Sequence, residues 1–389
     1  MICEPDDRAH GILPLYGQPE RVLARARGCR LVDAQGRPYV DFESGVWAAN
    51  LGHAHPAVNR AIRRSLNAVM HQGYAFRSAE AETLAAHLAR LHGLPGGRSV
   101  FLSSGSEAVN LGLQIAMHLS GRRRFVRLDG SYLAAFGFGR LAADNERRID
   151  LRCDDLAAID AVPWHEAAAL VLEVGGASLE VVRFPREDFV ARAVEAARRA
   201  GACIVCNEVT TGFGRTGRWF GYQHYGLVPQ LVACGKALGN GYPVSALTVD
   251  AAVAAALDAQ PLRYAQSHQN DPGGCAAALA VIEALEAGDW VARGAAVGEH
   301  FAARLAALQQ RRPQQVLDVR GRGLMLALQL ADEALAQRVA RRLFERGQVV
   351  GQRGASLRFM PPLTVTKAMV DTLVREIGRA LAAEPGAPR

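Results

Sequence analysis

Apolar and amphipathic stretches alternate through the middle of the chain. Five short stretches are almost continuously apolar, and the pattern predicts a buried strand at each, at residues 99–104, 124–130, 167–176, 202–208 and 230–235. Between them, amphipathic stretches at 106–121 and 187–201 predict helices that end at glycines. Continuous apolar strands separated by helices are typical of a parallel sheet that is covered on both faces.

The two ends of the chain show a different pattern. Residues 318–330 and 356–364 predict strands, and helices are predicted at about 290–310, 332–346 and 366–383. Residues 29–45 predict a hairpin with its turn at 34–36, which is expected to pack with these C-terminal elements. We therefore predict an α/β fold with a mostly parallel central sheet covered by helices, and a smaller α+β domain built from both termini.

This pattern divides the chain into three predicted parts. Residues 1–50 form an N-terminal segment that packs with the small domain, 51–285 form a large ligand-binding domain, and 286–389 form the small C-terminal domain. A chain of 389 residues is long enough for two such domains.

Composition and charge exclude several classes of protein. No apolar run reaches the roughly 18 residues of a membrane span, so a membrane is not an expected partner. The net charge of +7 is spread along the chain without interleaved aromatic residues, so nucleic acid is not expected either, whereas an anionic small molecule fits. The chain begins without a signal-peptide pattern, and its seven scattered cysteines argue against a disulfide framework, so we expect a cytoplasmic protein.

Two pairs of potential metal ligands stand close together in the sequence. Cys203 and Cys206 are three residues apart on a predicted strand, where they point to opposite faces, so we interpret both as small core residues. His53 and His55 have no third ligand near them in sequence. We therefore expect no metal site.

The glycine-rich stretch "LVACGKALGNGYP" contains one of only two lysines among 45 cationic residues, Lys236, the other being Lys367. Unlike arginine, lysine can lose its proton and form a Schiff base, so its survival in an arginine-rich chain suggests this chemistry, although chance would also explain it. The stretch is not a Walker phosphate loop, because Ala237 follows where serine or threonine is needed. No G-x-S-x-G motif of a serine hydrolase is present.

Polar and small residues follow each of the predicted parallel strands, at the edge of the sheet where ligands bind in open α/β folds. The residues are Ser103, Ser104, Gly105, Ser106, Tyr132, Glu173, Asn207, Glu208, Val209 and Lys236. The serine and glycine residues open a helix whose N-terminal amides would bind a phosphate, although Ser104 with Glu107 also fits a simple helix cap. Together the set describes a pocket for a flat phosphorylated ring that a lysine holds covalently, which is pyridoxal 5′-phosphate.

Several segments resemble the class III aminotransferases, the ornithine and acetylornithine type of fold type I pyridoxal-phosphate enzymes. The most specific is "NEVTTGFGRTGRWFGYQHYGLVPQLVACGKALGNGYP", at residues 207–243. "LVDAQGRPYVDFESGVWAANLGHAHP", "SSGSEAVNLGLQIA", "VRGRGLML" and "LRFMPPLT" resemble other landmarks of the family, so the resemblance covers nearly the whole chain.

The resemblance implies a role for each matching residue. Lys236 would form the Schiff base and carry the proton, while Gly105 and Ser106, with Ser104 before them, would hold the phosphate. Tyr132 and Val209 would cover the two faces of the ring, and Glu173 and Asn207 would also contact the cofactor. Ser267 would reach the phosphate in the partner subunit of a homodimer whose active sites lie at the interface. Arg358 would bind the substrate carboxylate, although a surface arginine is the alternative, and Trp47 would line the substrate channel unless it is plain core.

The sequence departs from the family pattern at four places. Asn207 stands where the family has the aspartate that keeps the ring nitrogen protonated, which predicts slower or altered carbanion chemistry. The other departures are Leu133-Ala134, the run from Val174 to Ser178, and "NDPGGC", and they put ornithine and acetylornithine specificity in doubt.

These inferences predict an aminotransferase that exchanges an amino group between an amino acid or amine donor and a 2-keto acid, with pyridoxal 5′-phosphate as cofactor. Two alternatives remain. Asn207 motivates another carbanion reaction on the same cofactor, such as racemisation, decarboxylation, or elimination and replacement. The second alternative is a cofactor-binding protein with little turnover.

Overall fold

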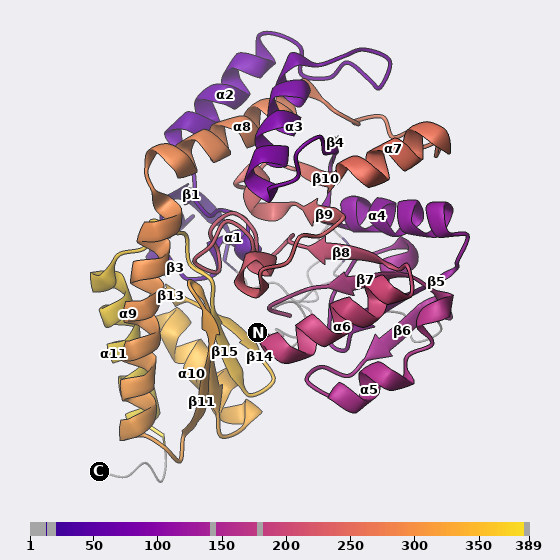
Figure 1. Cartoon of the computed structure of the whole chain (residues 1–389). Coiled ribbons are helices and arrows are strands. Elements are labelled where there is room, and N and C mark those ends of the chain that lie inside the picture. The colour runs from indigo at the N-terminus through magenta and orange to yellow at the C-terminus, as the bar shows by residue number, and fades with distance from the viewer. Residues whose placement is uncertain (1–12, 14–20, 141–144, 177–181, 385–389) are drawn as a thin grey trace.

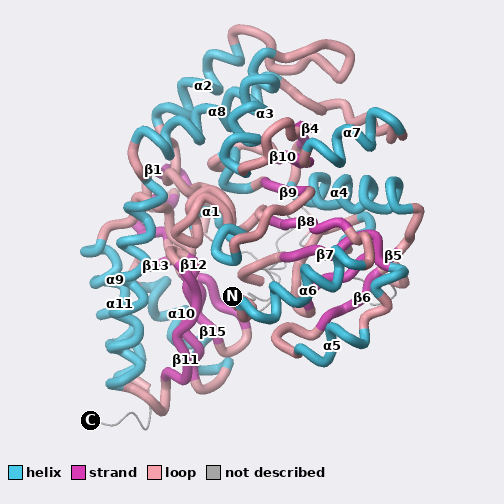
Figure 2. The backbone as a smooth tube through the Cα atoms, viewed as in Figure 1, coloured by secondary structure: helices cyan, strands magenta, loops and turns pink. Residues whose placement is uncertain are grey.

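The structure is a computed structural model that describes residue 13 and residues 21–140, 145–176 and 182–384 (Figures 1 and 2). A central seven-stranded sheet forms its largest layer. Its strands are β4 (Arg98–Leu102), β5 (Arg124–Leu128), β6 (Arg148–Leu151), β7 (Ala167–Leu172), β8 (Cys203–Asn207), β9 (Leu231–Cys234) and β10 (Ser245–Val249). They lie in the order β4-β10-β9-β8-β7-β5-β6, and only β10 runs antiparallel to its neighbours. The mostly parallel sheet is confirmed, as are all five predicted strands, whereas β6 and β10 were not predicted.

Helices cover both faces of this sheet, as Figure 1 shows. On one face α4 (Gly105–Ser120) packs over β7 to β10, and on the other α6 (Glu187–Arg199) packs over β7 and β8. Alternate strand residues enter two separate apolar clusters, so Cys206 joins the cluster under α6 while Cys203 packs against the cluster under α4. The interpretation of these two cysteines as core residues on opposite faces is confirmed.

Further helices surround the large sheet at both of its edges. They are α2 (Pro56–Leu66), α3 (Ala79–His92), α5 (Leu156–Ala161), α7 (Ala251–Ala259) and α8 (Pro272–Ala287), with short 3-10 turns at Gly137–Gly139, Trp164–Glu166, Gly221–Tyr225 and Lys236–Gly239. The predicted boundary at residue 285 falls in the last turn of α8. The division into domains stays a prediction. Among the described residues, no helix combines the length and apolarity that crossing a membrane requires.

The C-terminal third forms a four-stranded antiparallel sheet with three helices. The strands are β11 (Val316–Arg322), β12 (Met325–Leu330), β15 (Ser356–Phe359) and β14 (Gly351–Arg353), in that spatial order. The helices are α9 (Trp290–Arg311), α10 (Glu333–Glu345) and α11 (Lys367–Ala382), each within one residue of its predicted bounds. The α+β prediction for this region is confirmed.

The N-terminal hairpin packs with this C-terminal region, as predicted. Strands β1 (Leu23–Arg27), β2 (Arg30–Asp33) and β3 (Pro38–Asp41) are antiparallel, and β13 (Gln348–Val349) adds to β3 in parallel. The Asp33 carboxylate closes the turn because it accepts hydrogen bonds from the amides of Gln35 and Arg37. The hairpin leads into the short turn α1 (Ser44–Trp47), which brings Trp47 towards the large sheet.

Candidate active site

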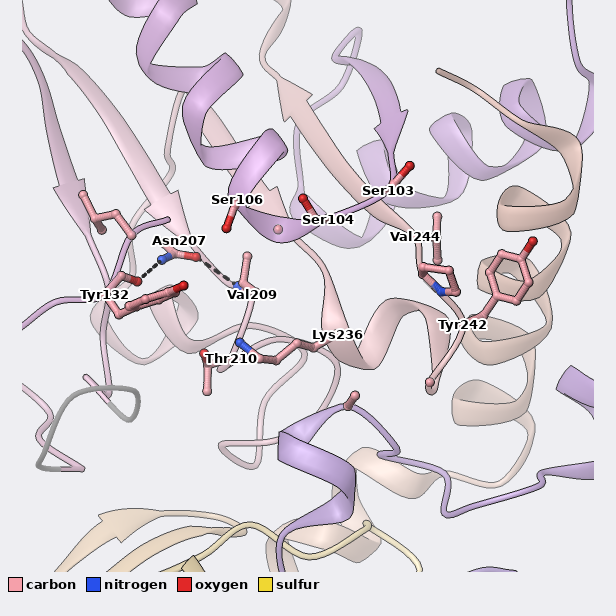
Figure 3. A pocket seen from close by; sticks show the side chains of 15 residues that line it. Ser103, Ser104, Ser106, Tyr132, Asn207, Val209, Thr210, Lys236, Tyr242 and Val244 are labelled. Carbon is pink, nitrogen blue, oxygen red and sulfur yellow. Dashed lines mark hydrogen bonds between the residues drawn. The ribbon is translucent and has the colours of Figure 1, made fainter. Parts of the chain in front are cut away.

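A cavity of about 330 Å³ lies at the carboxyl edge of the large sheet (Figure 3). It is lined by Ala48, Ser103, Ser104, Gly105, Ser106, Tyr132, Leu133, Asn207, Val209, Thr210, Lys236, Gly241, Tyr242, Pro243 and Val244. The structure therefore brings together eight of the ten strand-end residues selected from the sequence, at the ends of β4, β5, β8 and β9. Glu173 stands directly behind this lining, whereas Trp47, Arg358 and Ser267 do not line the cavity.

The start of α4 forms one end of the cavity. Ser104 caps the helix because its hydroxyl accepts a hydrogen bond from the Glu107 amide at 3.3 Å, so the simple capping interpretation of this serine is correct. The next amides, of Gly105 and Ser106, belong to the first turn, where no intrahelical acceptor exists. They remain suited to an anion, because the helix dipole adds positive potential at the same point.

Glycine is required at position 105 by the close approach of a neighbouring strand end. A Cβ atom there would lie 2.6 Å from Cγ1 of Val209, which is closer than real Cβ contacts. A Cβ on Gly235 would likewise lie 3.3 Å from Cα of Gly105. The start of α4, Val209 and the residue before Lys236 are thus packed into one compact wall.

Glu107 and Gln266 hold the start of α4 in place. Sequence reasoning named Glu107 only as part of the Ser104 cap and missed Gln266. The Glu107 carboxylate accepts hydrogen bonds from the Ser103 amide at 3.1 Å and the Ser104 hydroxyl at 2.9 Å. Gln266 donates to the Ser103 hydroxyl at 3.1 Å and to Glu107 at 2.9 Å. This fixes the loop before α8 against the cavity, while the adjacent Ser267 is exposed on the surface of the chain.

The side-chain amide of Asn207 is oriented by two partners that cannot exchange roles. Its Nδ2 donates to the Tyr132 carbonyl at 3.2 Å, and its Oδ1 accepts from the Val209 amide at 3.2 Å (Figure 3). A carbonyl only accepts and an amide N–H only donates, so the positions of nitrogen and oxygen follow from the network. One N–H and one lone pair remain for a ligand in the cavity.

A buried carboxyl group stands behind Tyr132 and near Lys236. Glu173 follows β7 and accepts a hydrogen bond from the Tyr132 amide at 2.7 Å. Burial raises its pKa to about 7, against the opposing effects of that hydrogen bond and of the Lys236 charge. Glu173 therefore positions Tyr132 and contributes a titratable charge beside the lysine.

Lys236 projects into the cavity from a strained backbone position. Its φ of 43° lies in the left-handed region, which is uncommon for a residue with a side chain and is typical of functional sites. Burial lowers the pKa of the Lys236 amine, while the Glu173 charge opposes that shift. A depressed pKa increases the fraction of neutral, nucleophilic amine.

Trp47 links the lysine to Arg358. The Lys236 Nζ lies 5.3 Å and the Arg358 Cζ 5.1 Å from the centroid of the Trp47 ring, within cation–π range. Arg358 is 8% exposed, on β15, so the surface interpretation is wrong for this chain. All four residues of α1 have positive φ, from 44° at Ser44 to 68° at Trp47, and this left-handed turn places the indole beside Lys236.

Glu43 completes this group, and sequence reasoning did not identify it. Its carboxylate accepts a hydrogen bond from the Trp47 indole at 3.2 Å. Burial raises its pKa to about 7, whereas the Arg358 charge favours the ionised form.

Two of the residues that depart from the family pattern can now be placed. Leu133 lines the cavity, and Ser178 lies outside the described residues.

Arg215 ties the segments around the cavity together from beneath. Its side chain is fully buried and donates to the carbonyls of Leu324, at 3.1 Å, and Pro361. It also donates to the Ser44 hydroxyl, at 3.0 Å, and to Asn50. Burial lowers the pKa of Arg215 to about 9. These bonds fix α1 to the turn before β12 and to the segment after β15, which lie at the same end of the C-terminal sheet.

The cavity fits a flat phosphorylated aldehyde. Open helix amides lie at one end, Tyr132 and Val209 both line the cavity, and Asn207 has an unused polar position. Lys236, with its depressed pKa, lines the same space. The absence of a side chain at Gly105 lets Val209 pack directly against the start of α4.

Comparisons with known proteins agree with this description. The family model for aminotransferase class III matches residues 15–133 and 130–381. The acetylornithine aminotransferase of Myxococcus xanthus is 31% identical over 379 residues, which cover 92% of this chain and 93% of that protein. The acetylornithine aminotransferase of Archaeoglobus fulgidus is 29% identical over 376 residues, covering 93% and 96%.

Solved structures show the same fold. An amine transaminase from an uncultivated Pseudomonas species, determined in its pyridoxal-phosphate-bound form, has a TM-score of 0.86 at 25% identity and covers 98% of this chain and 99% of its own. The ornithine aminotransferase of Toxoplasma gondii also has a TM-score of 0.86, at 23% identity, with 95% and 92% covered. The second likeness is one of fold alone.

Proposed function

The chain belongs to the class III aminotransferase family, and from that premise we propose that it transfers the amino group of a carboxylated donor to a 2-keto acid with Lys236 as the reacting side chain. Membership confirms three predictions: the fold type I architecture, pyridoxal 5′-phosphate as cofactor, and transaminase activity on an amino donor and a keto acid. The roles of individual residues, the donor and the assembly are the content of the proposal.

The residues around the cavity would hold the cofactor at four points. The first-turn amides of α4, from Gly105 and Ser106, would bind the phosphate, and Tyr132 and Val209 would cover the ring. Asn207 would meet the ring nitrogen through its remaining N–H or lone pair. When bound, pyridoxal 5′-phosphate supplies an electron-withdrawing ring that stabilises negative charge at the substrate's Cα.

Lys236 would act twice. As a neutral amine its Nζ would hold the cofactor covalently, and once an amino donor is bound the same atom would accept the proton from the donor's Cα. The depressed pKa suits both steps, because a protonated amine can do neither. Glu173 moderates the shift, so the amine also holds the accepted proton long enough to return it.

Arg358 would bind the donor's carboxylate through its planar fork. Trp47 lies within cation–π distance of both Arg358 and Lys236, and it therefore spaces the carboxylate site from the reacting amine. Glu43 lies close to Arg358, and a substrate carboxylate would replace the Glu43 carboxylate as the partner of the Arg358 guanidinium. The proposal therefore favours α-amino acids over simple amines as donors.

We further propose a cytoplasmic homodimer with active sites at the interface. Ser267 supports the dimer, because it is exposed yet sits beside Gln266, which is anchored to the start of α4. The six described cysteines are all free, which agrees with a reducing compartment. Light scattering on the cofactor-loaded protein should give twice the chain mass, and the mass of a single chain would contradict the interface role of Ser267.

The observation that carries the proposal is the convergence of Lys236, Asn207 and the open N-terminus of α4 on one cavity. The test supplies the loaded protein with pairs of donors that differ only in the α-carboxylate, and records the visible spectrum together with keto acid. Keto acid from the carboxylated member of a pair supports the proposal. Spectral change without keto acid would favour the alternative that Asn207 motivates, another carbanion reaction on the same cofactor.

A further inference from the structure

Two histidines and one aspartate meet beside the candidate active site, outside the set already described. His71 Nδ1 lies 2.8 Å from one oxygen of Asp271, and His268 Nδ1 lies 2.6 Å from the other. The two imidazole rings are 4.6 Å apart between centroids. One ligating atom from each residue lies within 4.8 Å of those of the others, the only such group of three or more among the residues that the structure describes.

The Asp271 carboxylate has an orientation that its own helix does not explain. Asp271 is the N-cap of α8, where an aspartate ordinarily accepts bonds from the first-turn amides, yet its side chain makes no capping bond. Its oxygens turn instead towards the two imidazoles, with the Gln72 amide at 3.4 Å as a further donor. The carboxylate is 14% exposed, so it is held in this direction in a mostly buried position.

Backbone packing fixes the two segments that carry these side chains. The Gly273 amide donates to the Met70 carbonyl at 3.4 Å, and a Cβ on Gly273 would lie 2.8 Å from the Met70 methyl group. Residues 70–72 are thereby pressed against the start of α8, whose first four residues are buried. The glycines of "NDPGGC" allow this approach, which explains part of that departure from the family pattern.

We propose that His71, His268 and Asp271 bind a divalent transition-metal ion of the Zn²⁺ class. Two imidazole nitrogens and one carboxylate oxygen are a donor set that Zn²⁺ takes readily, whereas Mg²⁺ and Ca²⁺ prefer oxygen ligands alone. The histidine side chains are 49% and 61% exposed on the single chain. Each ring would bind the ion through Nδ1 as a neutral imidazole with its proton on Nε2.

An ion at this position would act on the edge of the active site. Asp271 lines a second cavity, of about 320 Å³, together with Ser103 and Tyr242, both of which also line the first. His268 directly follows Ser267. Metal binding would tie the loop 266–271 to the segment 70–72 and hold both beside the start of α4. His71 is 200 residues from Asp271 in the chain, so sequence reasoning expected no metal here.

The test is calorimetric titration of tag-free, cofactor-loaded, chelator-treated protein with Zn²⁺. We expect one ion per chain. The Zn²⁺ affinity should fall at least about tenfold in His268→Gln and in Asp271→Asn, because even substitution of a residue that only hydrogen-bonds a metal ligand usually lowers metal affinity by about that factor. His165→Gln is the matched control, because His165 is an exposed histidine that also neighbours a carboxylate. It should bind Zn²⁺ as the unaltered protein does.

Co²⁺ provides a second readout, because its visible bands report nitrogen ligation independently of affinity. Saturating Zn²⁺ should also raise the melting temperature of the unaltered protein but not of His268→Gln, which separates loss of the site from loss of the fold. The proposal is overturned if the unaltered protein takes up no Zn²⁺, or if both substitutions at the site bind it as tightly as the control.

Discussion

The substitution Asn207→Asp restores a charge at the floor of the active site, and the structure sets what it should do. In the cofactor-free protein the new oxygen would replace Nδ2, which donates to the Tyr132 carbonyl at 3.2 Å. Two acceptors would then face each other, and a buried acceptor without a donor costs about 1–3 kcal/mol. We therefore expect the cofactor-free variant to be less stable by this amount.

In the cofactor-loaded protein the same carboxylate gains a partner in the protonated ring nitrogen. A hydrogen bond to a charged group contributes about 1.5–3 kcal/mol, against about 1 kcal/mol for the neutral amide. The difference of about 0.5–2 kcal/mol corresponds to a rate increase of about 2- to 30-fold if it is expressed in the transition state. Amino transfer by Asn207→Asp should be faster by a factor in this range.

The assay is a single-turnover measurement with saturating donor, accompanied by urea unfolding of the cofactor-free protein. Asn207→Leu is the control, because it removes the polar group without adding charge and should be slower than the unaltered protein. If Asn207→Asp is fully loaded yet no faster, then residue 207 does not face the ring nitrogen and the reasoning is refuted.

Three further predictions concern the surrounding residues. Burial lowers the pKa of Lys236 and the Glu173 charge opposes that shift, so Glu173→Gln should lower the Lys236 pKa further. The pH midpoint for cofactor capture, followed by stopped-flow absorbance, should therefore move to lower pH. An upward shift would contradict the assignment of Glu173. Arg358→Lys keeps the charge but loses the bidentate fork. The KM for an α-amino acid should therefore rise about tenfold or more, while the KM for the matching amine stays constant. Equal changes in the two KM values would exclude carboxylate binding by Arg358. Arg215→Met leaves several buried acceptors without a donor, so the unfolding free energy measured in urea should fall by at least about 3 kcal/mol. A loss under about 1 kcal/mol would show that the Arg215 hydrogen bonds do not hold α1.

The predictable part of the fold is the part whose residues are buried on both sides. Strands such as Ala167–Leu172 are apolar at every position, and this follows directly from a parallel sheet between two helical layers. The edge strand Arg148–Leu151 carries charged residues and could not be recognised in this way. Strand Ser245–Val249 is also buried throughout, but a serine and a threonine interrupt its apolar run, so the same pattern does not reveal it.

The site residues that directly follow the parallel strands could be predicted from the sequence. Tyr132, Asn207 and Lys236 meet because the carboxyl ends of neighbouring parallel strands share an edge. The link from Lys236 through Trp47 to Arg358 joins three distant segments, and no local pattern encodes it. The same holds for Gln266, whose bonds to Ser103 and Glu107 arise only when its loop folds back over α4.

The central claim is that Lys236 bonds the cofactor, and the chain makes the test unusually clear because it contains only one other lysine, Lys367. The protein would be loaded with pyridoxal 5′-phosphate, reduced with borohydride to trap the bond, digested, and analysed by peptide mass spectrometry. We expect the cofactor's added mass on the peptide containing Lys236 and on no other. Modification of Lys367 instead, or of neither lysine in a protein that carries the cofactor, would contradict it.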